Sequence, residues 1–142
     1  MPSHADSVRL AWAAGLFEGE GCIAAPAKSP HQFHLMVISA DLDVLMKFAD
    51  IVGCGTILEK PRPANKPHWS DTWVWQAFGD SAEFTLRSML RHLCGRRFAR
   101  ACEALKIRDE YRQSVMRERS CHICGNPFRP RFTPNSAKSF LC

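Results

Sequence analysis

Two glutamates at the end of an apolar segment are the residues of this chain best suited to chemistry. The segment 13–21 reads Ala-Ala-Gly-Leu-Phe-Glu-Gly-Glu-Gly, so Glu18 and Glu20 are separated and then followed by glycine. Helical spacing of the preceding apolar residues puts Glu20 at a helix C-terminus, where a carboxylate costs a few tenths to about 1 kcal/mol against the macrodipole. A cation bound at Glu20 would reverse that cost. The alternative is an ordinary glycine-capped helix end with solvated carboxylates.

Small residues recur at every fourth position of the same helix. Ala11, Gly15 and Gly19 share one helical face, because side chains four residues apart lie above one another. A stripe of small residues lets a second helix approach closely, as it does between membrane helices. Gly19 and Gly21 each weaken the helix by about 1 kcal/mol relative to alanine. We therefore expect this face to pack against another helix.

The rest of the sequence predicts one α+β domain over residues 6–116. The expected elements are a helix at 6–18, strands at 22–28 and 32–39, a helix at 41–52, strands at 55–60 and 72–78, and helices at 81–94 and 96–116. Gly53 ends the second helix, Asp80 caps the third, and the proline-rich segment 61–67 cannot be helical. This α-β-β-α-β-β-α order, with an added C-terminal helix, predicts one antiparallel sheet with its helices on one face.

Composition narrows the class of protein. The chain has 142 residues, 46% of them hydrophobic, and a formal net charge of +5. No apolar run approaches the ~20 residues of a membrane span, and the N-terminus lacks a secretory leader, so a cytoplasmic location and no membrane partner are predicted. The seven cysteines are then thiols or metal ligands. Arginine is concentrated in the second half, which favours a polyanionic partner; the alternative is a solvated basic helix face.

The segment 13–21, the Gly53-x-Gly55 turn and the element order together resemble the LAGLIDADG homing endonucleases, over roughly residues 8–112. Ala13 stands in place of leucine, and glutamate in place of aspartate. The resemblance implies a concave, saddle-shaped sheet that lies along the DNA major groove. It also implies that the second acidic position, Glu20, binds the catalytic metal, Mg²⁺ or Mn²⁺. The carbonyl of Gly19 is a further candidate ligand.

The resemblance also implies supporting roles for residues near the metal. A polar residue at the end of the second strand, Ser39, would help to order the attacking water. A basic residue at the start of the last core helix, Arg96 or Arg97, would contact the site. The alternative for both arginines is ordinary phosphate anchoring. Glu18 is the weaker candidate ligand and is expected to support the helix end or a water network.

DNA contacts are expected from polar strand residues and from basic residues around them. The candidates are His34, Thr56, Lys60, Gln76, Lys66 and Arg100. Trp73 and Trp75 alternate with Gln76 along one strand, so they share a face and are expected to pack beneath the helices.

The sequence contains one copy of the acidic segment, so each chain supplies one clear carboxylate, Glu20. Two chains packed through Ala11, Gly15 and Gly19 would bring two such carboxylates together, and single-motif members of the resembled family are homodimers of this type. A twofold dimer predicts a palindromic or near-palindromic duplex DNA site. The predicted activity is metal-dependent, double-strand, site-specific DNA cleavage. The alternative is a non-cleaving nucleic-acid binder, an intron-splicing cofactor or transcription regulator, on the same fold.

The tail, residues 117–142, carries a candidate zinc site. Cys121 and Cys124 flank a tight turn that ends in Gly125, and two thiolates at this spacing are typical of a Zn²⁺ knuckle. Cys142 would be a third ligand, and the segment resembles a treble-clef or ribbon-type zinc finger that lacks its fourth ligand. The alternative is a disordered basic tail with incidental thiols. A further reading makes this tail the functional module and the core its scaffold.

Overall fold

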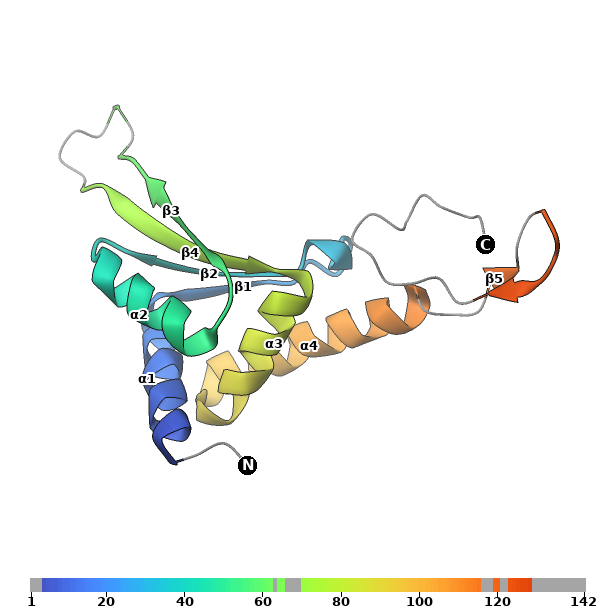
Figure 1. Ribbon diagram of the computed structural model, residues 1–142, viewed down its shortest axis with the longest axis horizontal. Helices are drawn as coiled ribbons and strands as arrows, with labels where there is room; N and C mark the ends of the chain where they lie inside the picture. The colour runs from blue at the N-terminus through green and yellow to red at the C-terminus, as the bar shows by residue number, and fades with distance from the viewer. Residues whose placement is uncertain (1–3, 63, 66–69, 116–118, 121–122, 129–142) are drawn as a thin grey trace.

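A computed structural model of the chain describes residues 4–62, 64–65, 70–115, 119–120 and 123–128 (Figure 1). The helices are α1 (His4–Glu20), α2 (Leu42–Val52), α3 (Gly79–Met89) and α4 (Gly95–Val115), with 3-10 turns η1 (Pro30–Gln32) and η2 (Leu90–His92). The strands are β1 (Gly21–Ala24), β2 (His34–Ser39), β3 (Thr56–Lys60) and β4 (Thr72–Phe78), followed by β5 (Arg119–Ser120) and β6 (Pro127–Phe128). Within the described ranges, no helix combines the length and apolarity that crossing a bilayer requires.

The four main strands form one antiparallel sheet in the order β1-β2-β4-β3. Helices α1, α2 and α3 cover one face of this sheet, and α4 extends from the same side (Figure 1). The architecture confirms the predicted α+β class and the predicted order of elements. An antiparallel sheet with helices on one side leaves its second face available to solvent.

The core lies between the sheet and the helices. Alternate residues of the central strands point into it, so Leu35, Val37 and Trp75 are fully buried. The ring of Phe48 from α2 meets the Trp75 ring edge-on, with centroids 4.8 Å apart. Trp73 packs against the same core. The prediction that both tryptophans lie beneath the helices is therefore confirmed.

Two glycines, Gly21 and Gly55, allow the backbone to pass close to an aromatic side chain. A Cβ on Gly21 would collide with the Phe17 carbonyl and ring, so glycine is needed where the chain leaves α1 and enters β1. Gly55 adopts a positive φ of 91°, and a Cβ there would collide with the Trp75 indole. The indole Nε1 donates to the Cys54 carbonyl at 2.9 Å. The predicted Gly53-x-Gly55 turn thus fastens the end of α2 to the sheet.

Several element boundaries differ from the prediction. The first strand ends at Ala24 because the chain turns through Pro26, whose carbonyl accepts from the Ser29 N–H at 3.0 Å. The next strand starts two residues late, because Pro30–Gln32 forms a 3-10 turn. The other helices keep to the predicted limits within two residues, apart from the third.

The third helix differs most from its predicted limits, because it ends at Met89 and the predicted end is residue 94. It begins at Gly79, and Phe78 occupies the N-cap position that was predicted for Asp80. Asp80 lies in the first turn, where its carboxylate accepts hydrogen bonds from Arg108 at 2.9 Å and Arg112 at 2.8 Å. The helix ends at Met89, because the chain tightens into a 3-10 turn before α4 begins. Asp80 therefore joins α3 to α4 instead of capping α3.

Candidate metal-binding and DNA-binding site

Glu20 is the last residue of α1, at the point where the chain enters the sheet. Its side chain is exposed, and no hydrogen bond or ion pair within the described residues engages its carboxylate. An acidic group at a helix C-terminus is unfavourably placed against the macrodipole. The structure therefore keeps a carboxylate open to a ligand at a position where folding alone would favour a cation.

Ser39 lies at the same end of the sheet as Glu20. Strand β1 starts at Gly21 opposite Val37, and the antiparallel β2 ends at Ser39. The Ser39 hydroxyl accepts a hydrogen bond from the Asp41 N–H at 3.0 Å, so it supports the start of α2. Its predicted role in ordering water stays a prediction.

Glu18 and Arg97 join the end of α1 to the start of α4. The Glu18 carboxylate accepts the Cys94 N–H at 2.6 Å, and Arg97 donates to the Glu18 main-chain carbonyl at 2.9 Å. The Arg97 guanidinium also lies over the Phe17 ring, 5.7 Å from its centroid. Through these contacts Glu18 ties the end of α1 to the start of α4. They also place a cation at the negative end of α1, which offsets the cost of ending that helix with an acid.

The two arginines predicted near the site therefore differ in their surroundings. Arg97 is half-buried and holds the α1 terminus, whereas Arg96 is exposed one residue earlier on α4. The sequence pattern did not reveal the hydrogen bond between Cys94 and Glu18, which links residues 76 positions apart. A contact of this range leaves no local signal in either segment.

An ion network that the sequence analysis did not identify holds α4 against α3. Arg108 is buried, with 2% of its side chain exposed, and its guanidinium lies 2.9 Å from Asp80 and 3.5 Å from Glu83. Arg112 contacts the same two carboxylates at 2.8 and 2.7 Å. The sequence signal that could have revealed this network is charge spacing. Two acidic residues lie three positions apart on α3, and two arginines lie four positions apart on α4.

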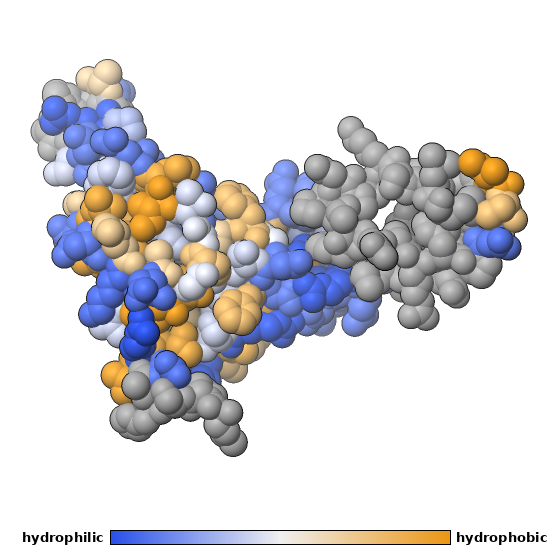
Figure 2. Space-filling view, viewed as in Figure 1, coloured by the Kyte–Doolittle hydropathy of each residue, from blue (hydrophilic) through white to orange (hydrophobic). Residues whose placement is uncertain are grey.

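Arg87 extends this network on the surface of α3. Hydrogen bonds to Asp109 at 2.6 Å and to Glu83 at 3.0 Å raise the pKa of Arg87 above its ordinary value. The network fixes the direction of α4 away from the end of α1. Figure 2 shows hydrophilic residues along the visible side of this helix.

The uncovered face of the sheet gathers four of the predicted DNA-contacting residues. Register pairs Thr56 with Gln76 and Lys60 with Thr72, and alternation along β2 puts His34 on the same face. His34 lies beside the Phe78 ring, with centroids 5.4 Å apart. Contact of these residues with DNA stays a prediction.

Arg100, one of the remaining two predicted contacts, does not lie on this face of the sheet. Arg100 lies on α4, where its guanidinium contacts Glu103 at 2.7 Å. Lys66 lies outside the described residues. The helical side of the molecule therefore carries Arg100, and the sheet carries the other four.

The stripe of small residues on α1 faces away from the core. Ala11, Gly15 and Gly19 are exposed, and a Cβ built on either glycine would meet no atom within 4 Å. Val8, 57% exposed, continues the same face. This face of α1 has no charged residue among these four positions, which is unusual for a helix surface that only water covers.

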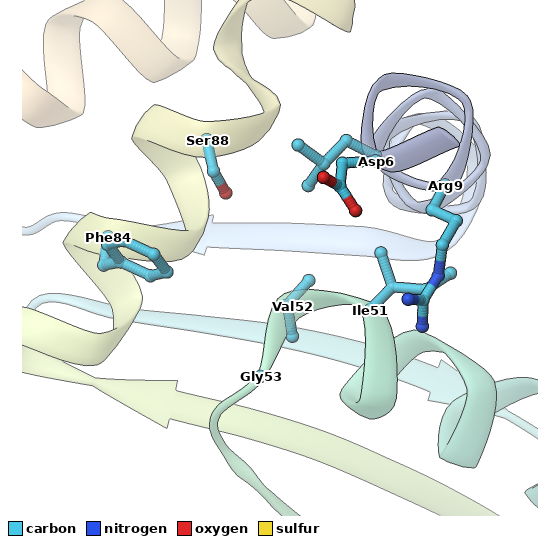
Figure 3. Close-up of a pocket in the computed structure, with 8 residues that line it drawn as sticks. Asp6, Arg9, Ile51, Val52, Gly53, Phe84 and Ser88 are labelled. Carbon is cyan, nitrogen blue, oxygen red and sulfur yellow. The ribbon is translucent and has the colours of Figure 1, made fainter. Parts of the chain in front are cut away.

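A groove of about 450 Å³ lies elsewhere, between α1, the end of α2 and α3 (Figure 3). Asp6 and Arg9 line it from α1, and Phe84 and Ser88 from α3. An ion pair with Asp50 holds Arg9. No predicted site residue lines this groove, so it belongs to a different part of the surface.

The described residues of one chain do not assemble a metal centre by themselves. The described residues contain no group of three or more His, Cys, Asp or Glu side chains that could hold an ion. Mg²⁺ usually takes one or two protein carboxylates and completes its octahedral shell with waters and phosphate oxygens. The exposed Glu20 fits such a site if a second chain contributes the other carboxylate. Of the predicted zinc ligands, Cys124 is exposed, and Cys121 and Cys142 lie outside the described residues.

The fold, with an acidic residue between α1 and a four-stranded antiparallel sheet, is the LAGLIDADG homing endonuclease fold. Among solved structures, the chain is similar to the homing endonuclease I-CvuI in complex with the I-CreI target in 2 mM Mg, where the DNA is not cleaved. The TM-score is 0.61 and the identity 23%, over 79% of this chain and 73% of that one. I-CvuI with its Sro1.3 target in 2 mM Ca gives the same score and identity over 80% and 74%. No family model and no curated protein matches the sequence.

Proposed function

We propose that this chain is a DNA endonuclease that works as a homodimer and holds divalent metal through Glu20. The observation that carries the proposal is the exposed Glu20 carboxylate, without a described partner, at the α1 terminus. The fold is one that DNA-bound homing endonucleases use, and no described helix covers the second face of the sheet. A binder without cleavage gains nothing from a carboxylate at this position, because it would repel phosphate.

The residues around Glu20 have distinct proposed parts in the reaction. Mg²⁺ or Mn²⁺, when bound, lowers the pKa of water and neutralises phosphate charge. Glu20 and the Gly19 carbonyl would hold the ion, and Ser39 would orient the attacking water. Arg96 contacts the scissile phosphate. Arg97 is a positioning residue, because its guanidinium holds the Glu18 carbonyl.

Cleavage of a randomised duplex library tests the proposal. We expect the wild-type chain with Mg²⁺ to cut a subset of sequences on both strands, and the cut sites to be palindromic or nearly so. Products are identified by ligation and sequencing. Binding without cleavage in both Mg²⁺ and Mn²⁺ would instead show that the chain is a non-cleaving nucleic-acid binder.

Substitution of Gly15 by leucine is expected to weaken dimer formation while the single chain still folds. A side chain at Gly15 meets open space in the monomer, and leucine adds up to about 1 kcal/mol of helix propensity. In a close helix pair the same side chain overpacks the interface by about 1–3 kcal/mol, or about 5- to 140-fold in dimer dissociation constant. Sedimentation equilibrium and thermal melting measure both effects.

The matched control adds leucine on another exposed helix position. Gln113→Leu, near the end of α4, should leave dimerisation unchanged. A Gly15→Leu chain that dimerises as tightly as wild type would exclude the small-residue face of α1 as the interface.

We further propose that the tail, as a second unit after the core of residues 6–116, binds Zn²⁺ through Cys121, Cys124 and Cys142. Supporting this, β5 pairs with β6 across the Cys-x-x-Cys-Gly turn, and Gly125 has a φ of 72°. Purified protein should contain about one zinc ion per chain by elemental analysis. The ion should be lost in Cys124→Ser and kept in the control Cys102→Ser on α4. A zinc content near zero in the wild-type chain contradicts the proposal.

A further inference from the structure

The uncovered face of the sheet carries an aliphatic row across three strands. Val74 of β4 pairs with Ile38 of β2 on one side and with Leu58 of β3 on the other. Leu58 is 45% exposed, and the other two side chains are partly exposed. Helices α1, α2 and α3 lie on the opposite face, so no described helix covers this row (Figure 1).

The groups that border the row are mostly polar, and one is a cation. The next level on one side holds Thr56, Gln76 and the apolar Met36, and the level on the other side holds Lys60 and Thr72. Among the described strand residues of this face there is no carboxylate, because Glu59 alternates to the other side. A border of this kind complements a polyanion that presents apolar groups at its centre.

We propose that Leu58, Val74 and Ile38 read thymine methyl groups in the major groove, and that the target therefore has A·T pairs at the positions they cover. This inference rests on the proposed DNA-binding function. The C5 methyl of thymine is the apolar group that base pairs present in that groove. Adjacent strands lie about 4.8 Å apart, so the row spans about 10 Å and fits a groove about 12 Å wide.

The position of the row also predicts where the thymines lie. Strand β1 starts at Gly21 opposite Val37, the residue before Ile38, so the row stands at the Glu20 end of the sheet. We expect the contacted thymines closer to the cleavage position than to the outer end of each half-site.

Replacement of thymine by deoxyuridine tests the inference, because it removes the methyl group and keeps base pairing. Duplexes that wild-type protein selects from a randomised pool, with Ca²⁺ in place of Mg²⁺, are resynthesised with one deoxyuridine at a time. Fluorescence anisotropy gives each dissociation constant. We expect about fourfold weaker binding for each contacted methyl group and no change at other thymines.

Two variants connect the effect to the row. At one thymine position of each half-site, Leu58→Ala should bind the thymine duplex and the deoxyuridine duplex with equal affinity. Its melting temperature should stay unchanged, because Leu58 is half exposed. Met46→Ala is the control, since Met46 is 58% exposed on α2, on the helical side. It should keep the full deoxyuridine effect.

The outcomes separate this inference from the proposed function. Tight binding to a selected site with no deoxyuridine effect at any thymine overturns the thymine reading and leaves DNA binding in place. A deoxyuridine effect that persists in both Leu58→Ala and Val74→Ala also overturns it. Failure to bind any duplex overturns the proposed function, and the inference with it.

Discussion

Glu20→Gln is expected to reduce the rate of DNA cleavage by at least about a hundredfold, with little change in DNA affinity. The substitution keeps the size of the side chain and removes the negative charge that holds the metal. Loss of one charge-stabilising group at a reacting centre typically costs about 10²- to 10³-fold in rate. Affinity should persist, because the uncovered sheet face and the arginines supply the DNA contacts. Single-turnover cleavage and anisotropy on the same duplex measure the two quantities.

Glu110→Gln is a matched control, because Glu110 is exposed on α4 and lies 4.0 Å from Lys106. It should cut at the wild-type rate. The metal dependence adds a second check. If the defect of Glu20→Gln is weakened metal binding, a higher concentration of Mg²⁺ or Mn²⁺ should recover part of its lost cleavage rate. Cleavage at the wild-type rate by Glu20→Gln would remove this residue from the reaction and the proposed metal site with it.

Arg108→Ala is expected to lower the free energy of unfolding by about 3–5 kcal/mol. The change empties the space of a large buried side chain and takes one cation from the buried Glu83, and each of these losses is costly. Urea denaturation should show a lower midpoint with an unchanged slope. Arg108→Met should lose less unfolding free energy than Arg108→Ala, because methionine keeps most of the side-chain volume. In both variants Glu83 retains its contacts with Arg87 and Arg112.

Arg100→Ala is the control for this prediction. Its ion pair with Glu103 lies on the surface of the same helix, and exposed pairs contribute about 0.2–1 kcal/mol. Equal effects of Arg100→Ala and Arg108→Ala would contradict the docking of α4 on α3. A large effect at Arg108 alone would show that the buried network, and not the surface ion pair, stabilises the packing of α4 on α3.

The positions of the helices and strands were largely predictable, because their signals are local. Apolar residues at helical spacing marked α1 and α2, β-formers marked β4, and Gly53 marked the end of α2 with its left-handed φ of 71°. The errors fell where tertiary contacts compete with local preference. Asp80 has the chemistry of an N-cap, yet its carboxylate serves arginines 28 and 32 residues away.

By itself, the sequence determined the order of elements, the small-residue face of α1 and the acid at its end, since each depends on spacing within one segment. Only the tertiary structure decided which side chains meet. Strand register brought His34, Thr56, Lys60 and Gln76 to one face and formed the row of Leu58, Val74 and Ile38 between them. Long-range contacts joined Glu18 to α4 and buried Arg108. Such contacts depend on how elements distant in the chain pack together, and no local pattern encodes that arrangement.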